Sequence, residues 1–104
     1  MPPQTEAGFL STVIAYARLR RWLVHHSRPA MSRTGRWATA LSGDCGLPDL
    51  ILVRANKVLW LELKTDAGRL TWAQRQWAER LQAAGQEYHL FRPKDWPQIV
   101  KCLE

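Results

Sequence analysis

The hydrophobic pattern of the chain changes its period several times. Apolar residues recur at helical spacing in two segments, whereas four others are short apolar or alternating runs typical of strands. Thr5 before Glu6 and Thr71 before Gln74 resemble helix caps, and Pro93 opens a third helix. The predicted order is αβββαβα, with helices over residues 6–21, 71–84 and 93–103 and strands over 22–26, 49–53, 58–64 and 88–91.

This order predicts a mixed α/β fold in which helices pack on a small sheet. The 104 residues suffice for one domain, residues 1–104, and not for two. A long loop is predicted over residues 27–47, and such loops in compact domains are often functional. Because the sequence has neither a signal peptide pattern nor a long apolar stretch, we expect a cytoplasmic protein with no membrane association.

The charge distribution indicates a polyanionic partner. The net charge is +6, and the stretch between Ala7 and Gly43 holds six arginines and no acidic residue. Arginine suits phosphate because its planar guanidinium binds two oxygens at once. A solvated, solubilising face is the alternative. We expect this partner to be DNA, and its contacts to come from Arg18, Arg21, Arg28, Arg33 and Arg36. Trp37 would either stack on an unpaired base or pack the loop down.

The cysteines and histidines predict no metal site by their spacing. Two cysteines without a CxxC pair give neither a disulfide framework nor a structural zinc site. His25 and His26 are adjacent, but His89 stands alone on its strand. Cys45 is expected to be a small buried filler.

Acidic residues gather at one end of the predicted sheet. Alternation along strand 58–64 places Glu62 and Lys64 on the face opposite its leucines, and Asp49 begins the preceding strand. An antiparallel hairpin brings Asp49 beside Glu62. Two neighbouring carboxylates repel unless a cation or a proton joins them, and hard oxygen ligands suit Mg²⁺ or Mn²⁺. An ordinary surface pair between Glu62 and Lys64 is the alternative.

The register of this hairpin decides whether the carboxylates meet. Pairing Asp49 with Glu62, or with Lys64, keeps all three side chains on one face. Either register leaves an even-length turn that contains Asn56, and asparagine readily takes the positive φ of tight hairpin turns. An odd turn would separate the carboxylates unless a bulge restored the phase.

Three segments together resemble a known family. They are Gly46-Leu47-Pro48-Asp49-Leu50, Trp60-Leu61-Glu62-Leu63-Lys64-Thr65, and Gly68-Arg69-Leu70-Thr71 with Gln74 and Trp77. They are similar to the VRR-NUC nucleases of the PD-(D/E)XK superfamily, over nearly the whole chain. The resemblance implies a restriction-endonuclease-like αβββαβ core and Mg²⁺-dependent cleavage of DNA, with Mn²⁺ able to substitute.

The resemblance also implies roles for single residues. Asp49, Glu62 and the backbone carbonyl of Leu63 would bind the metal, and Lys64 would orient or deprotonate the attacking water or stabilise the developing charge. Gln74 would support the site from the following helix, although the capping box explains it equally well. For Glu6 the resemblance implies a place near the metal, and a favourable helix start is the alternative.

The leading interpretation is a metal-dependent, structure-specific endodeoxyribonuclease. Resemblance to the short stand-alone members implies a homodimer that cuts four-way (Holliday) junctions and leaves 5′-phosphate and 3′-hydroxyl ends. The alternatives are a nuclease acting on flap or simple duplex DNA, and a non-catalytic DNA-binding protein with a nuclease fold.

Overall fold

The computed structural model describes residues 5–27 and 42–104 and confirms the predicted order of elements. Each observed element lies within two or three residues of its prediction. The helices and strands are α1 (Glu6–Leu19), β1 (Leu23–His26), β2 (Leu50–Arg54), β3 (Lys57–Leu63), α2 (Trp72–Ala83), β4 (Glu87–Phe91), the 3-10 turn η1 (Pro93–Asp95) and α3 (Trp96–Leu103).

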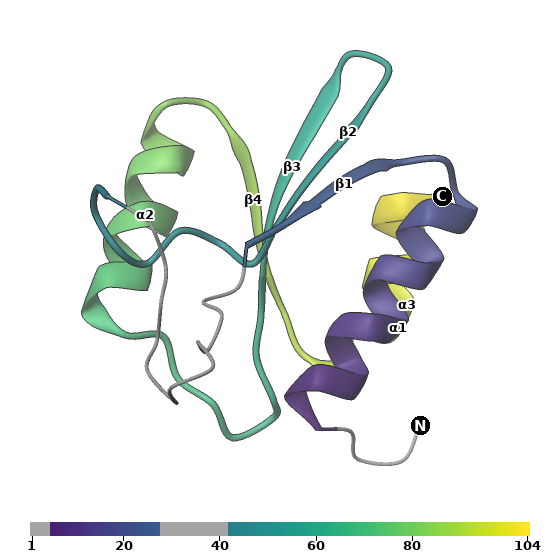
Figure 1. Cartoon of the computed structure of the whole chain (residues 1–104), viewed down its shortest axis with the longest axis horizontal. Coiled ribbons are helices and arrows are strands. Elements are labelled where there is room, and N and C mark those ends of the chain that lie inside the picture. Colours follow the sequence, from purple (N-terminus) through teal and green to yellow (C-terminus); the bar gives the residue numbers. More distant parts are fainter. Residues whose placement is uncertain (1–4, 28–41) are drawn as a thin grey trace, which may run out of the picture.

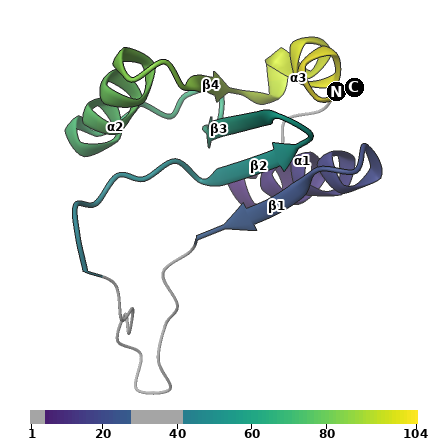
Figure 2. The same ribbon diagram turned by 90° about the horizontal axis from the view of Figure 1, so that it is seen from above.

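The four strands form one mixed sheet in the order β1-β2-β3-β4. The first two pairings are antiparallel, and β3 pairs with β4 in parallel, so α2 forms the crossover between them. Helices α1 and α3 lie together on one side of the sheet, whereas α2 lies on the other side and contacts β4 (Figures 1 and 2). The mixed α/β class is therefore confirmed.

The hydrophobic core lies between the sheet and the α1–α3 layer. Alternate residues of β3, namely Leu59, Leu61 and Leu63, are almost completely buried on this face. They pack against side chains such as Phe9 of α1 and Ile99 of α3, which have no exposed surface. Burying each such side chain contributes about 1.5–3 kcal/mol. This packing fixes which face of β3 is apolar and leaves the other face for polar side chains.

The β2–β3 hairpin has the register that brings the acidic residues together. Leu50 pairs with Leu61 and Arg54 pairs with Lys57, so the turn has two residues and the same register sets Asp49 opposite Glu62. The prediction of an even-length turn is confirmed. The residue with positive φ is Ala55, at 54°, and not Asn56 as we expected from asparagine's preference.

Within the described ranges, no helix is long and apolar enough to cross a membrane.

Candidate active site

Three charged side chains meet where β3 ends. Glu62 is the next-to-last residue of β3, Lys64 follows the strand, and Asp49 immediately precedes β2. The Asp49 carboxylate accepts a hydrogen bond of 2.8 Å from the backbone N–H of Leu63 through Oδ2, which fixes its orientation. The Lys64 N–H in turn donates to the Phe91 carbonyl at 3.1 Å, so the chain after β3 stays attached to the sheet.

Glu62 is buried although it is acidic. Only 2% of its surface is exposed, and its pKa is raised from 4.5 to about 9. Burial is the largest cause, followed by a hydrogen bond with Asp49 and the negative charge of Asp49. The positive charge of Lys64 opposes this rise, so Asp49 and Lys64 both lie within electrostatic range of Glu62.

Glu6 belongs to the same neighbourhood. It stands in the first turn of α1, behind an N-cap in which Thr5 Oγ1 accepts from the Gly8 N–H at 3.0 Å. Its charge also raises the pKa of Glu62. The two interpretations of Glu6 are therefore compatible, because the start of α1 places the same carboxylate near the acidic pair.

A fifth group, Tyr88, was not identified from the sequence. Its phenol oxygen is buried without a hydrogen-bond partner in the described part of the chain, and the pKa is raised to about 12 by burial and by the charges of Glu62 and Asp49. Tyr88 pairs with Trp60 in the parallel β3–β4 ladder, so it shares the face of Glu62. Period-two alternation could have placed it there only if the parallel pairing had been known.

The acidic pair fits a hard divalent cation. Two carboxylates lie side by side, and a proton on Glu62 is what keeps them together when no cation is bound. Oxygen donors of this kind are the ligands that Mg²⁺ and Mn²⁺ prefer. A metal role for the Leu63 carbonyl stays a prediction, and the bond from Leu63 to Asp49 comes from its N–H.

Gln74 caps helix α2. Its Oε1 accepts from the Thr71 N–H at 2.9 Å, and its own N–H donates to Thr71 Oγ1 at 3.1 Å. These bonds complete the capping box expected from the sequence. A catalytic role for Gln74 stays a prediction.

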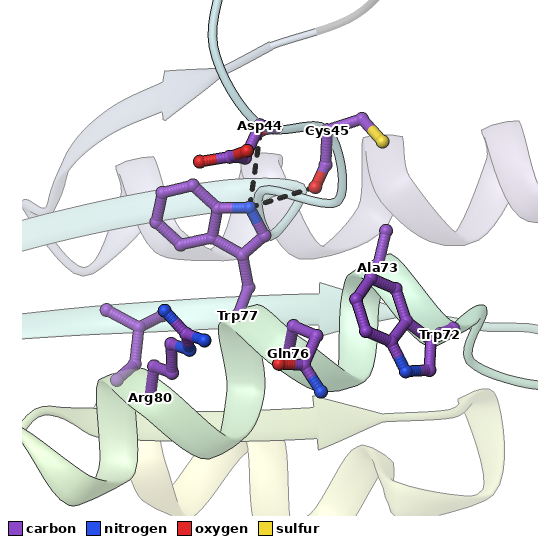
Figure 3. A pocket seen from close by; sticks show the side chains of 8 residues that line it. Asp44, Cys45, Trp72, Ala73, Gln76, Trp77 and Arg80 are labelled. Carbon is purple, nitrogen blue, oxygen red and sulfur yellow. Dashed lines mark hydrogen bonds between the residues drawn. The ribbon is translucent and has the colours of Figure 1, made fainter.

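The loop that leads to Asp49 is clamped onto α2. The indole N–H of Trp77 donates to the backbone carbonyls of Asp44 and Cys45, at 3.3 and 3.0 Å (Figure 3). Gly46 has φ +100°, and a Cβ there would lie 2.5 Å from the Ala73 carbonyl group. Cys45 itself is exposed, so the expectation of a buried filler is wrong. This contact sets the position from which the chain enters β2.

Beside this clamp lies a cavity of about 400 Å³. Its lining includes Trp72, Trp77 and Arg80 of α2, and Figure 3 shows Trp77 pointing from the helix toward the loop. Asp49, Glu62 and Lys64 are not among the lining residues. The cavity therefore belongs to the loop contact rather than to the charged group at the end of β3.

The loop after Lys64 is also anchored. The guanidinium of Arg92 donates to the backbone carbonyls of Thr65 and Gly68. The Arg92 backbone N–H donates to Asp95 Oδ2 at 2.8 Å, which ties this contact to the start of η1. Both chain segments that flank the charged group are thus held by the surrounding fold.

The predicted DNA-binding residues are not all placed by the structure. Arg28, Arg33, Arg36 and Trp37 lie outside the described residues. Arg18 is in the last turn of α1 and Arg21 follows the helix; both are exposed. At 1.5 Å per residue, the twelve-residue separation sets Arg18 about 18 Å along α1 from Glu6.

Comparison with solved structures supports the fold assignment. A chain described as a "VRR_NUC domain protein" matches with a TM-score of 0.66 and 23% sequence identity, over 97% of this chain and 86% of that one. The present chain has the VRR-NUC domain fold. The resemblance carried by the three sequence segments is thereby confirmed at the level of the fold. Comparisons with protein-family profiles and with curated proteins found no match.

Proposed function

We propose that this protein is a divalent-metal-dependent endonuclease that hydrolyses DNA phosphodiester bonds at the end of β3. The observation that carries the proposal is the buried Glu62 beside Asp49, with Lys64 close enough to lower the Glu62 pKa. Burying an acid next to another acid destabilises the fold, and a purely structural role would not offset this destabilisation. The VRR-NUC domain fold supports the same interpretation.

Each of the three residues has a distinct part in the proposed mechanism. Asp49 and Glu62 would hold Mg²⁺ or Mn²⁺, with the Leu63 carbonyl as a further ligand. The bound ion would supply Lewis-acid chemistry, neutralising charge on the scissile phosphate and activating water. The Leu63 N–H keeps the Asp49 carboxylate aimed at the site. Lys64 would orient the attacking water or stabilise the negative charge that develops on the phosphate oxygens.

The protonation of Glu62 is coupled to cation binding. At neutral pH its carboxyl holds a proton while no cation is bound, because its pKa is about 9. It must release that proton to act as a metal ligand. Glu6, whose charge is felt at Glu62, would contribute to holding the cation from the start of α1.

The substrate that we propose is branched DNA, a four-way junction, cut by a homodimer with one site in each subunit. Support comes from the resemblance to short stand-alone family members, since a twofold dimer matches the two symmetric strands of a junction. Light scattering at micromolar concentration, with and without junction DNA, should give the mass of a dimer. A monomer in both samples would remove this part of the proposal.

A cleavage assay on four-way, flap, splayed and linear DNA, with Mg²⁺ or Mn²⁺, tests the function. Symmetric nicking of the junction would support the junction-cutting dimer, whereas cleavage of flap or linear DNA alone would support the simpler nuclease. Binding without cleavage of any substrate would identify a non-catalytic DNA-binding protein.

The variant Lys64→Ala tests the assignment of the site. We expect it to cleave at least about a hundredfold more slowly, because a charge-stabilising group is lost, and to bind DNA almost as well. Lys94→Ala removes an exposed lysine outside the site and serves as the matched control. If Lys64→Ala cleaved at the native rate, the assignment of the active site would be wrong.

A further inference from the structure

A second group of metal-ligating side chains lies between β4 and α3. Glu87 and His89 alternate on β4, and Cys102 is in the last turn of α3. One donor atom of each residue lies within 4.8 Å of the other two. We propose that the Glu87 carboxylate, the His89 imidazole and the Cys102 thiolate bind Zn²⁺ or a cation of similar preference, independently of the proposed nuclease activity.

This site is separate from the acidic pair in two ways. Glu87 and His89 pair with Leu59 and Leu61, so they share the face of the sheet that α1 and α3 cover. Glu62 points to the opposite face, and its partner in the ladder is Leu90. Glu87 also lies toward the hairpin end of β3, whereas Glu62 lies at the other end.

The donor set selects the kind of metal. One sulfur, one nitrogen and one oxygen suit Zn²⁺ or Co²⁺, whereas Mg²⁺ requires oxygen ligands. Zinc lies about 2.0–2.3 Å from such ligands in a tetrahedral arrangement, so its donors lie about 3.3–3.6 Å apart, closer than the 4.8 Å within which the three donors lie here. Small side-chain rotations would therefore close the three donors around one ion, and water would take a fourth position. Cys102 would bind as the thiolate and release its proton to solvent.

The surrounding contacts orient two of the donors. Nε2 of His89 lies 2.8 Å from Oε2 of Glu87, a hydrogen bond that the ion would replace, and the His89 ring stacks on Phe91 with centroids 5.0 Å apart. The other Glu87 oxygen, Oε1, lies 3.7 Å from the Lys57 ammonium. The stacking on Phe91 and the ion pair with Lys57 hold the two side chains beside each other before an ion binds.

A bound ion would attach the end of α3 to β4. The Leu103 carbonyl in the same turn already accepts from the Trp22 indole at 2.9 Å and from Arg54 at 3.0 Å. The ion would add a cross-link on the β4 side of that turn. The competing interpretation is a metal-free ion pair of Glu87 and His89, with Cys102 as packing.

Metal titration of the chelator-treated full chain tests the proposal. With Co²⁺ as the probe, we expect one equivalent to give a thiolate-to-metal charge-transfer absorption that Zn²⁺ abolishes and excess Mg²⁺ does not. Zn²⁺ at about a hundredfold above its Kd should raise Tm by about 10 °C or more. Absence of the thiolate band, or of a zinc-dependent rise in Tm, would overturn the proposal.

Variants locate the site. Cys102→Ala should lose the thiolate band, and Glu87→Gln, at a partly exposed position where the fold is not at risk, should weaken Co²⁺ binding about tenfold or more. Cys45→Ala removes the exposed cysteine and should leave the band intact. Asp49→Asn should leave it intact too, since that residue belongs to the other site. Loss of the band in either of the last two variants would place the metal elsewhere.

Discussion

Glu62 makes the stability of the protein depend on pH. Its pKa is 4.5 in the unfolded chain and about 9 in the fold, so between these values the folded state binds the additional proton. The free energy of unfolding is therefore highest below about pH 4.5 as far as this group is concerned, and falls as the pH rises toward 9. Without divalent cations, Glu62→Gln should flatten this dependence and be more stable than the native chain at pH 8, by at least about 1 kcal/mol.

Urea denaturation in the presence of a chelator, at several values between about pH 5 and pH 8, measures this effect. The same experiment with excess Mg²⁺ is the control, because a cation that replaces the proton should stabilise the native protein and not Glu62→Gln. Equal pH dependence of the two proteins in chelator would show that Glu62 is ionised in the fold.

Replacing Tyr88 should affect stability and activity differently. Its hydroxyl is buried without a hydrogen-bond partner in the described part of the chain, close enough to the acidic pair for their charges to raise its pKa. The free energy of unfolding of Tyr88→Phe should equal that of the native chain or exceed it by up to about 1 kcal/mol, because an unsatisfied polar group is removed. If the hydroxyl contacts the substrate or the attacking water, cleavage should slow about tenfold.

Denaturation and cleavage rates measured on one preparation decide the role of Tyr88. Tyr16 lies in α1, beside Trp96 and on the other side of the sheet from Glu62. Tyr16→Phe is therefore a matched control that should leave cleavage unchanged. A loss of stability in Tyr88→Phe would show that the hydroxyl has a partner after all.

Single residues show what sequence reasoning could reach. Alternation and hairpin register were enough to bring Asp49, Glu62 and Lys64 together, because both depend on neighbouring chain segments. Tyr88 and the Cys102–His89 proximity were missed. They depend on a parallel pairing across α2 and on how α3 packs against β4, and no local pattern encodes either.

At the scale of elements, the position of the loop from Gly46 to Asp49 depends on the close approach of Gly46 to helix α2. A Cβ on Gly46 would meet the backbone of Ala73, which cannot move without shifting α2. Gly46→Ala should therefore lower the free energy of unfolding by about 2 kcal/mol or more and slow cleavage, because Asp49 is displaced. Gly43→Ala is the matched control: its φ is +111°, but no atom lies within 4 Å of its Cβ position.

Urea denaturation and cleavage rates of the two glycine variants test this argument. Backbone strain alone should cost Gly43→Ala about 1 kcal/mol and leave cleavage unchanged. Equal losses in both variants would mean that the approach to α2 is unimportant.

The β2–β3 hairpin shows a limit of prediction at the scale of elements. The even length of the turn followed from the requirement that Asp49 and Glu62 share a face, and it is correct. The backbone conformation did not follow, because Ala55 takes the positive φ that asparagine usually adopts. Pairing of the two strands therefore outweighs the local preference of the turn residues.

At the scale of the whole molecule, the positive charge at the end of α1 lies away from the candidate active site. Glu6 at the start of α1 is within electrostatic range of Glu62, whereas Arg18 and Arg21 lie at the far end of the helix. The predicted separation of about 18 Å corresponds to about five base pairs of duplex, at 3.4 Å each. A bound duplex could thus contact both ends of α1 at once.

The salt dependence of DNA binding tests this arrangement. Each phosphate contact that is lost lowers the slope of log K against log salt by about 0.9. Replacing Arg18 and Arg21 by Gln should therefore reduce the slope by up to about 1.8 and weaken binding to every DNA sequence alike. Arg75→Gln, at an exposed position of α2 on the other side of the sheet, should leave the slope unchanged. An unchanged slope in the Arg18 and Arg21 variant would leave phosphate binding to other arginines and remove the end of α1 from the DNA-binding surface.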